Sequence, residues 1–321
     1  MNRRQFLAMP VAAAALGVFA GRAAVGEPGA INVTPQELDK VVGALPEKPF
    51  AVPARPRRLL VFSLTKGFPH SSVDLGARTF ELLGAKTGAW TTVITKDVAM
   101  FKPESLKGFD AVVMNNTTGR NLLDDPALRQ SLLDFVKGGK GLVGLHGATD
   151  AFYEKWPEYG EMMGGYFAGH PFRKISVKID DPASPLTAMF DGQGFAFSDE
   201  IYTFHGPYSR EKLRILLSID WENSGLSGGN RKDNDYALSW IRTYGEGRTF
   251  YCAFGHDHNV FWNPTILKHL LAGTQFALGD LKADATPSAK ASPAPAPARG
   301  PVLAPQPEKK PKPAAKPADK K

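Results

Sequence analysis

Histidines and carboxylates occur close together in the stretch from Gly141 to Phe172. Its first residues, GLVGL, are apolar enough for a buried strand, and His146 and Asp150 follow directly. A histidine exchanges a proton near neutral pH, and a nearby carboxylate can orient its ring. His146 is therefore the candidate catalytic base, with Asp150 orienting it. The alternative is a buried histidine whose ring is satisfied by backbone groups.

Aromatic residues and a second histidine follow in the same stretch. Trp156, Tyr159 and His170 lie in loop-rich sequence. The C–H faces of a sugar pack on aromatic rings while its hydroxyl groups form hydrogen bonds, so this mixture suits a carbohydrate ligand. We expect all three side chains to bind substrate. The alternative places the aromatic rings in the core and His170 in a turn.

Two later segments, SDEIYTFH and FGHDH, hold further acid–base or metal-binding groups. Glu200 is a reserve catalytic acid or metal ligand, and His256 is expected to contact substrate. His256 and His258, which are two residues apart, could equally both be exposed loop residues. Imidazoles and carboxylates bind divalent metals, but the helical H-E-x-x-H spacing is absent. The sequence therefore requires no cofactor, and a divalent metal ion remains an open alternative.

The only cysteine, Cys252, excludes an intramolecular disulfide, a zinc ribbon and an iron–sulfur site. It alternates with Phe250 and Phe254 in a strand-like run. This placement favours a buried, inert thiol over a nucleophile.

The order of apolar runs predicts an α/β fold. In the first half, four strand-like runs alternate with helix-period segments, which is typical of a parallel sheet with crossover helices; these runs are 58–64, 90–96, 109–116 and 141–145. The second half has mostly alternating or mixed runs, so we expect additional strands there, some antiparallel. A last helix is expected within 263–278.

Three of these strands end in polar residues. His70 follows the first strand, Asn116 ends the third and His146 follows the fourth. Ligands of open parallel sheets bind beyond the carboxyl ends of the strands. We therefore expect His70 and Asn116 to contact substrate at the same edge of the sheet as His146.

Both ends of the chain differ from the core in composition. Residues 1–24 join Arg3 and Arg4 to an alanine-rich apolar run and are typical of a twin-arginine signal peptide, which implies a periplasmic or secreted protein. A membrane anchor is the alternative, but the apolar run is short for a bilayer. Residues 25–56 form an N-terminal extension. Residues 281–321, rich in alanine, proline and lysine, are expected to be disordered.

The formal net charge of +7 belongs to these ends rather than to the core. From residue 283 onward there are eight basic and three acidic residues, and residues 1–24 add three arginines. The core therefore gives no support for nucleic-acid binding. The tail could touch anionic surfaces, although a solvated charge run is the simpler interpretation. The oligomeric state is not predicted.

Five motifs together resemble the ThuA-like, or trehalose-utilisation, family. They occur between residues 57 and 280 and comprise TKGFPHSS, GLVGLHGATD, WPEYGEMMGGYFAGHPF, SDEIYTF and GEGRTFYCAFGHD. The resemblance implies a flavodoxin-like sheet of the class I glutamine amidotransferase-like superfamily, with helices on both faces. It also implies a role in the metabolism of disaccharides and keto-sugars. Pro69 stands where such sequences often have arginine.

In true amidotransferases of this superfamily, the turn after the corresponding strand carries the nucleophile. Here the fourth strand runs into that turn with the sequence GLHGA, which contains no cysteine. Glutaminase chemistry is therefore not expected. The leading hypothesis is an exported enzyme, of lyase, isomerase or hydrolase type, that acts on a disaccharide or keto-sugar by removing a proton next to a carbonyl. The alternatives are a non-catalytic sugar-binding protein and a metal-dependent hydrolase.

Overall fold

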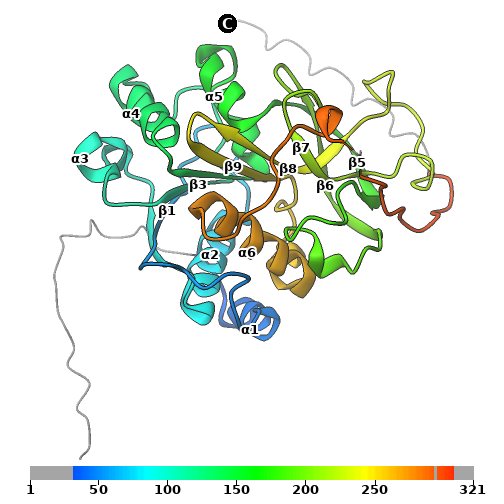
Figure 1. Ribbon diagram of the computed structural model, residues 1–321, viewed down its shortest axis with the longest axis horizontal. Coiled ribbons are helices and arrows are strands. Elements are labelled where there is room, and N and C mark those ends of the chain that lie inside the picture. Colours follow the sequence, from blue (N-terminus) through cyan, green and yellow to red (C-terminus); the bar gives the residue numbers. More distant parts are fainter. Residues whose placement is uncertain (1–31, 293–294, 307–321) are drawn as a thin grey trace, which may run out of the picture. The chain divides into compact units, whose positions relative to one another are not determined.

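The computed structural model describes residues 32–292 and 295–306 of the 321-residue chain (Figure 1). The predicted signal peptide lies outside the described residues. These described residues form a single compact unit around one sheet. None of its described helices has both the length and the apolar character needed to cross a membrane.

The sheet of the described residues has nine strands, in the order β2-β1-β3-β4-β9-β8-β7-β5-β6. Neighbouring strands from β2 to β9 are parallel, and all later neighbours in this order are antiparallel. The strands are β1 (Arg58–Phe62), β2 (Thr91–Thr95), β3 (Ala111–Asn115), β4 (Gly141–Leu145), β5 (Tyr166–Ile179), β6 (Phe195–His205), β7 (Arg214–Ile219), β8 (Ala237–Tyr244) and β9 (Gly247–Cys252). The prediction of a parallel sheet in the first half of the chain, with further strands in the second half of which some are antiparallel, is confirmed.

Helices cover both faces of this sheet. They are α1 (Pro35–Ala44), α2 (Val73–Thr87), α3 (Pro103–Leu106), α4 (Pro126–Lys137), α5 (Pro157–Met163) and α6 (Pro264–Leu278). Figure 1 shows α1, α2 and α6 on one face and α3, α4 and α5 on the other. Two hydrophobic clusters fill the two interfaces. Strands β3 and β4 are buried along their whole length, as expected for parallel strands covered on both sides.

The part of the N-terminal extension that the structure describes is folded. Thr34 and Glu37 form a capping box at the start of α1, in which each side chain accepts a hydrogen bond from the other residue's backbone. Val41 is fully buried against the core. This extension therefore packs on the domain rather than serving only as a spacer.

The described part of the C-terminal segment differs from the expected disordered tail. Ala298 exchanges two backbone hydrogen bonds of 2.9 Å with Ile179 near the end of β5. The neighbouring strand β6 pairs with β5 only as far as Val177. Ala298 therefore satisfies backbone groups of Ile179 that β6 leaves unpaired. Arg299 pairs with Asp220 at 2.5 Å, and the Asp220 carboxylate is almost completely buried. A segment with too few apolar residues for a core of its own thus docks through polar contacts.

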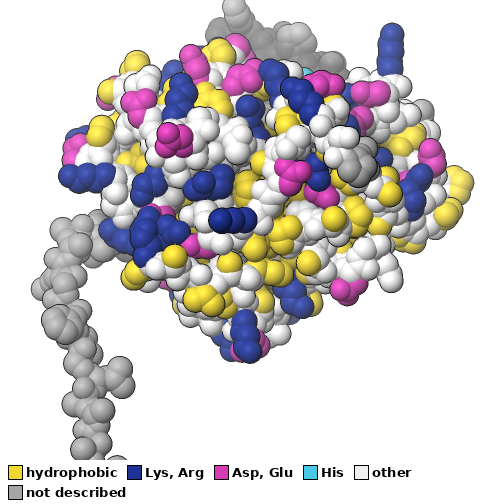
Figure 2. Space-filling view, viewed as in Figure 1, with side chains coloured by type: hydrophobic (Ala, Val, Ile, Leu, Met, Phe, Trp, Pro, Cys, Tyr) yellow, Lys and Arg dark blue, Asp and Glu magenta, His cyan; other side chains and the backbone are white. Residues whose placement is uncertain are grey.

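Figure 2 shows Lys and Arg side chains interspersed with Asp and Glu over the face that it displays. On this face the positive charges do not form one uniform surface of the kind that tracks a phosphate backbone.

Candidate metal centre

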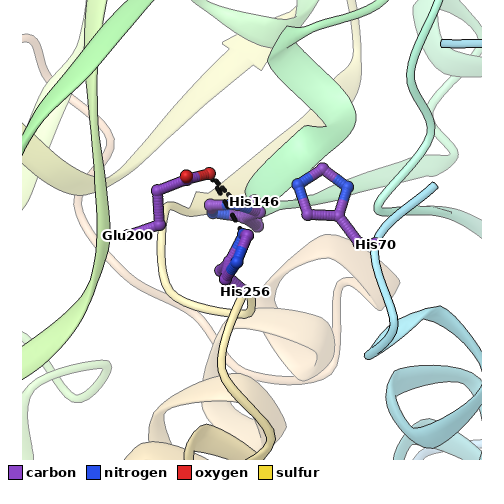
Figure 3. A group of neighbouring side chains, drawn as sticks. All are labelled: His70, His146, Glu200 and His256. Atoms are coloured by element: carbon purple, nitrogen blue, oxygen red, sulfur yellow. Dashed lines mark ion pairs between the residues drawn. The ribbon is translucent and has the colours of Figure 1, made fainter. Parts of the chain in front are cut away.

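Four side chains from widely separated parts of the sequence meet at the carboxyl edge of the parallel strands. His70 follows β1, His146 follows β4, His256 follows β9, and Glu200 lies within β6. Each offers one ligand atom, and these four atoms all lie within 4.8 Å of one another. Figure 3 shows the carboxylate of Glu200 directed toward His146 and His256, with the ring of His70 beside them.

His146 is the first residue of the 3-10 helix His146–Thr149, which begins directly after β4. Its φ of +40° lies in the left-handed region, which is strained for a residue with a side chain. Its Nδ1 atom lies 2.7 Å from the carbonyl oxygen of Ala253. A carbonyl only accepts, so Nδ1 carries the proton and the lone pair of Nε2 faces the cluster. Nε2 is buried, 3.6 Å from Glu200 and without a hydrogen-bond partner.

Asp150 does not orient His146, contrary to the expectation from the sequence, because Ala253 takes that position. The hydroxyl group of Tyr153 instead donates a hydrogen bond to Asp150. Burial raises the pKa of Asp150 to about 6, and the nearby charge of Glu200 acts in the same direction. Charges on His146 and Arg120 oppose this rise in the pKa. Asp150 is thus a carboxylate beside the cluster that titrates close to neutral pH.

Glu200 is the negative group of the cluster. Its carboxylate lies 3.1 Å from Nδ1 of His256 and 3.0 Å from Nδ1 of His170. Burial opposes ionisation of Glu200, but its contacts with His146 and His256 hold its pKa below the ordinary value. An ionised carboxylate among imidazoles is a common composition for a divalent metal site.

The residue before Glu200 fixes the loop that carries His256. The buried Asp199 carboxylate accepts hydrogen bonds from the backbone N–H groups of Gly255 at 2.7 Å and Asp257 at 2.8 Å. Its own neighbour Glu200 donates a third backbone bond at 2.9 Å. Asp199 therefore positions two members of the cluster at once. The sequence contains no signal for this role beyond the adjacent acidic pair.

His70 is buried at the other side of the cluster. Its ring centroid lies 4.9 Å from that of His146, and its Nε2 lies 3.4 Å from the hydroxyl of Tyr202. Burial lowers the pKa of His70 to about 3, so the ring is neutral and carries a lone pair. Its buried Nδ1 has no hydrogen-bond partner. An uncharged imidazole with an unsatisfied nitrogen fits a metal ligand.

Phe68 lies beside this cluster with an unusually exposed ring. Its side chain is 59% exposed, its centroid is 4.9 Å from that of His70, and it stacks at 6.3 Å on His256. Its carbonyl oxygen accepts hydrogen bonds from the hydroxyls of Thr65 and Thr118, so its backbone is anchored. Phe68 was not among the residues expected to bind substrate, although it precedes His70 by only two positions.

The structure distributes the other expected substrate-binding residues differently. Trp156 and Tyr159 are buried in the core under α5, where the Tyr159 hydroxyl donates to the carbonyl of Ala148. Asn116 is also buried, and its amide bonds Ser72, Gly147 and Gly255. These three side chains hold the site's loops and core rather than facing a ligand. His170 is 46% exposed at the edge of the cluster, as a ligand contact requires.

His258 lies outside the cluster. Its Nδ1 contacts Glu37 of α1 at 2.6 Å. Hydrogen bonds from Thr34 and then from His258 lower the pKa of Glu37 to about 2. His258 therefore ties the N-terminal extension to the loop after β9. Cys252 is buried, and burial raises its pKa to about 12, which confirms the expected inert thiol.

The donor set fits a divalent transition-metal ion. Three imidazoles and one carboxylate are nitrogen and oxygen ligands typical of zinc and its neighbours in the first transition row. An unpaired polar atom is costly to bury, and one ring nitrogen of each of two histidines, Nδ1 of His70 and Nε2 of His146, is buried without a hydrogen bond. Coordination would satisfy both. The carbonyl of Ala253 supplies the second contact that metal-bound histidines usually make.

A family profile described as ThuA, trehalose utilisation, matches residues 58–277. The chain belongs to the ThuA family. The matched range lies within residues 57–280, and the N-terminal extension and the C-terminal segment lie outside it. The predicted resemblance is confirmed, and the family description links the chain to carbohydrate metabolism.

Two solved structures of ThuA-like proteins have a related fold. The one from Bacteroides uniformis is 20% identical, covers 70% of this chain and 93% of its own, and superposes with a TM-score of 0.57. The one from Parabacteroides merdae is 16% identical, covers 71% and 92%, and has a TM-score of 0.51. No curated protein matches the sequence. At these identities the structural likeness concerns the fold alone.

Proposed function

We propose that this ThuA-family protein is a metal-dependent enzyme that acts on a carbohydrate, a disaccharide or its keto-sugar derivative. The observation that carries the proposal is the convergence of His70, His146, Glu200 and His256, whose ligand atoms all lie within 4.8 Å of one another. The family description supports the carbohydrate. The exposed ring of Phe68 beside the cluster supplies an apolar face of the kind that sugar rings pack on.

In this proposal the base is Asp150 rather than His146, whose Nε2 belongs to the donor set. A carboxylate with a pKa of about 6 is ionised at neutral pH and basic enough to remove the proton next to a sugar carbonyl. A bound divalent ion would supply Lewis-acid polarisation of that carbonyl. Phe68 and His170 then orient the sugar at the edge of the cluster.

We also propose that the parallel half of the sheet is flavodoxin-like, as in the class I glutamine amidotransferase-like superfamily. Its support is the strand order β2-β1-β3-β4-β9, which corresponds to the flavodoxin order 2-1-3-4-5. The position that an amidotransferase would use for its nucleophile carries His146, and the only cysteine is buried in β9. Glutaminase activity is therefore excluded from the proposal.

The test combines metal analysis with a substrate screen. Purified protein should contain close to one equivalent of a divalent transition metal and should convert at least one member of a panel of disaccharides and their 3-keto forms. Removal of the metal with a chelator should abolish turnover, and adding the metal back should restore it. Sugar binding that is independent of metal and without turnover would instead identify a non-catalytic binding protein.

We further propose that the protein is exported through the twin-arginine pathway and acts in the periplasm or outside the cell. The support is the pair Arg3 and Arg4 followed by an alanine-rich apolar run. Replacing both arginines by lysine should leave the precursor in the cytoplasm. Unchanged export of that variant would contradict this proposal.

A further inference from the structure

A groove of about 1010 Å³ opens next to the cluster formed by His70, His146, Glu200 and His256 (the four-residue cluster). It lies between β5 and the loop that joins β7 to β8. Two contacts connect it to the cluster. His170 lines the groove and contacts Glu200 at 3.0 Å. Arg173, also in the lining, pairs at 2.7 Å with Asp257, the residue after His256. A ligand that contacts the cluster at His170 would therefore extend directly into the groove.

The polar groups of the groove are mostly uncharged. Ser227 and Asn230 offer a hydroxyl and an amide group, Gln306 offers its amide oxygen as an acceptor, and Pro171 and Leu226 add apolar surface. The guanidinium of Arg173 is already paired with Asp257. This combination suits a neutral ligand with many hydroxyl groups and apolar C–H faces. It does not suit a phosphorylated or carboxylated ligand, which would need an unpaired cation.

The size of the groove exceeds the needs of one sugar ring. A volume of about 1010 Å³ lies at the upper end of the range for pockets that hold drug-sized ligands. A first sugar ring beside Phe68 and the four-residue cluster would leave this whole groove for a second sugar ring. The groove therefore matches the remainder of a disaccharide.

A segment outside the family match completes one wall. Gln306 lines the groove, and its side-chain amide donates to the carbonyls of Lys174 and Ser224, at 2.8 Å each. Residues 295–306 are held on the domain by Arg299, which pairs with Asp220. Since the family match ends at residue 277, this wall is specific to the C-terminal extension of the chain.

We propose that this groove is the binding subsite for the second sugar ring of an uncharged disaccharide whose first ring lies against Phe68 and the four-residue cluster. The inference rests on the proposed carbohydrate function. It adds that the enzyme prefers two-ring over one-ring substrates, and that the β7–β8 loop and the C-terminal segment set this preference.

The experiment measures binding of two-ring and one-ring probes by calorimetry on the full-length, metal-loaded protein. The two-ring probes are trehalose, maltose, sucrose and their 3-keto forms, and the one-ring probes are glucose and 3-ketoglucose. The best disaccharide should bind about ten-fold more tightly than the best monosaccharide, as one or two additional hydrogen bonds would give. Ala168→Trp and Ser227→Trp, two exposed lining positions, should each reduce that ratio to about two-fold or less while leaving monosaccharide affinity and metal content unchanged.

Ala85→Trp is the matched control, because Ala85 is exposed near the end of α2 and does not line the groove. It should keep the full disaccharide preference. If both groove variants also keep that preference, the subsite assignment is wrong while the metal site and carbohydrate function stand. If the metal-loaded wild-type protein binds none of the sugars, the proposed carbohydrate function fails, and the subsite assignment fails with it.

Discussion

The Nδ1 atom of His146 lies 2.7 Å from the carbonyl oxygen of Ala253, and this contact decides what the other ring nitrogen can do. It fixes the proton on Nδ1 and presents the lone pair of Nε2 to Glu200, His70 and His256. His269 is a useful contrast, because both of its ring nitrogens have partners. Its Nδ1 contacts Leu186 at 2.7 Å and its Nε2 contacts Ser239 at 2.8 Å.

His146→Gln should lose the metal with little loss of folding stability in the metal-free protein. The variant keeps a polar group near the carbonyl of Ala253 but removes the imidazole ligand. Losing one ligand of four should weaken metal binding by about 100-fold or more and abolish turnover. Metal titration and thermal unfolding of the metal-free protein measure the two effects separately.

His269→Gln is the matched control. It removes a buried histidine with two satisfied nitrogens, so its cost should fall on stability, on the order of 1–3 kcal/mol. The folded fraction should bind metal as the wild type does. The opposite result, with metal lost in His269→Gln and kept in His146→Gln, would contradict the assignment of the donor set.

Asp150 should set an acidic limit on activity. If its ionised form is the base, kcat/KM falls as the pH decreases through about 6, because protonation removes the base. Arg120 and His146 favour the ionised form, Glu200 disfavours it, and all three are near enough to affect the pKa. Asp150→Asn should lower kcat by about 100-fold or more without changing metal content. Near-normal turnover in this variant would exclude Asp150 as the base.

The hydroxyl of Tyr153 provides a finer test of the same role. It donates a hydrogen bond to Asp150, which stabilises the ionised form. Tyr153→Phe should therefore raise the pKa of Asp150 and move the acidic limb of the pH–rate profile to higher pH. A limb that stays in place, or moves to lower pH, would mean that a different group titrates.

Phe68 should act through substrate binding. Phe68→Ala removes the exposed ring next to His70 and His256 and should raise KM by about five- to ten-fold, since stacking contributes about 1 kcal/mol. Phe68→Tyr should keep KM near the wild-type value because it keeps the ring. Folding stability should not fall in Phe68→Ala, because the ring is mostly exposed. Equal KM values for all three proteins would remove the stacking role.

The part of the site built on parallel strands could be predicted from the sequence. His70 and His146 follow strands that run in the same direction, so their positions at strand ends place them at one edge of the sheet. Glu200 could not be placed in this way. Its strand β6 lies at the far end of the sheet order, and four strands separate it from β4. Register shifts in β5 between Phe167 and Lys174 bend the hairpin that carries it, and periodicity does not encode such bends.

Residue type also gave no information on which way an aromatic ring points. Trp156 and Tyr159 have the composition of a sugar site, yet α5 turns both into the core. Phe68, in a segment that looks like an ordinary loop, is the ring that remains exposed beside the cluster. Burial of an aromatic side chain depends on packing between distant elements, which a single sequence does not specify.

The docked C-terminal segment should contribute to stability, contrary to what its composition suggests. A protein ending at Asp280 loses the Ile179–Ala298 bridge and leaves the buried carboxylate of Asp220 without Arg299. The loss in the free energy of unfolding should be on the order of 3 kcal/mol, or about 10 °C in Tm.

A protein ending at Gln306 keeps every described contact and is the control, with a Tm equal to that of the full chain. Arg299→Ala should lie between the two, since the guanidinium is half exposed and the backbone contacts remain. Equal Tm values for the proteins ending at Asp280 and Gln306 would show that the segment does not hold to the domain in solution.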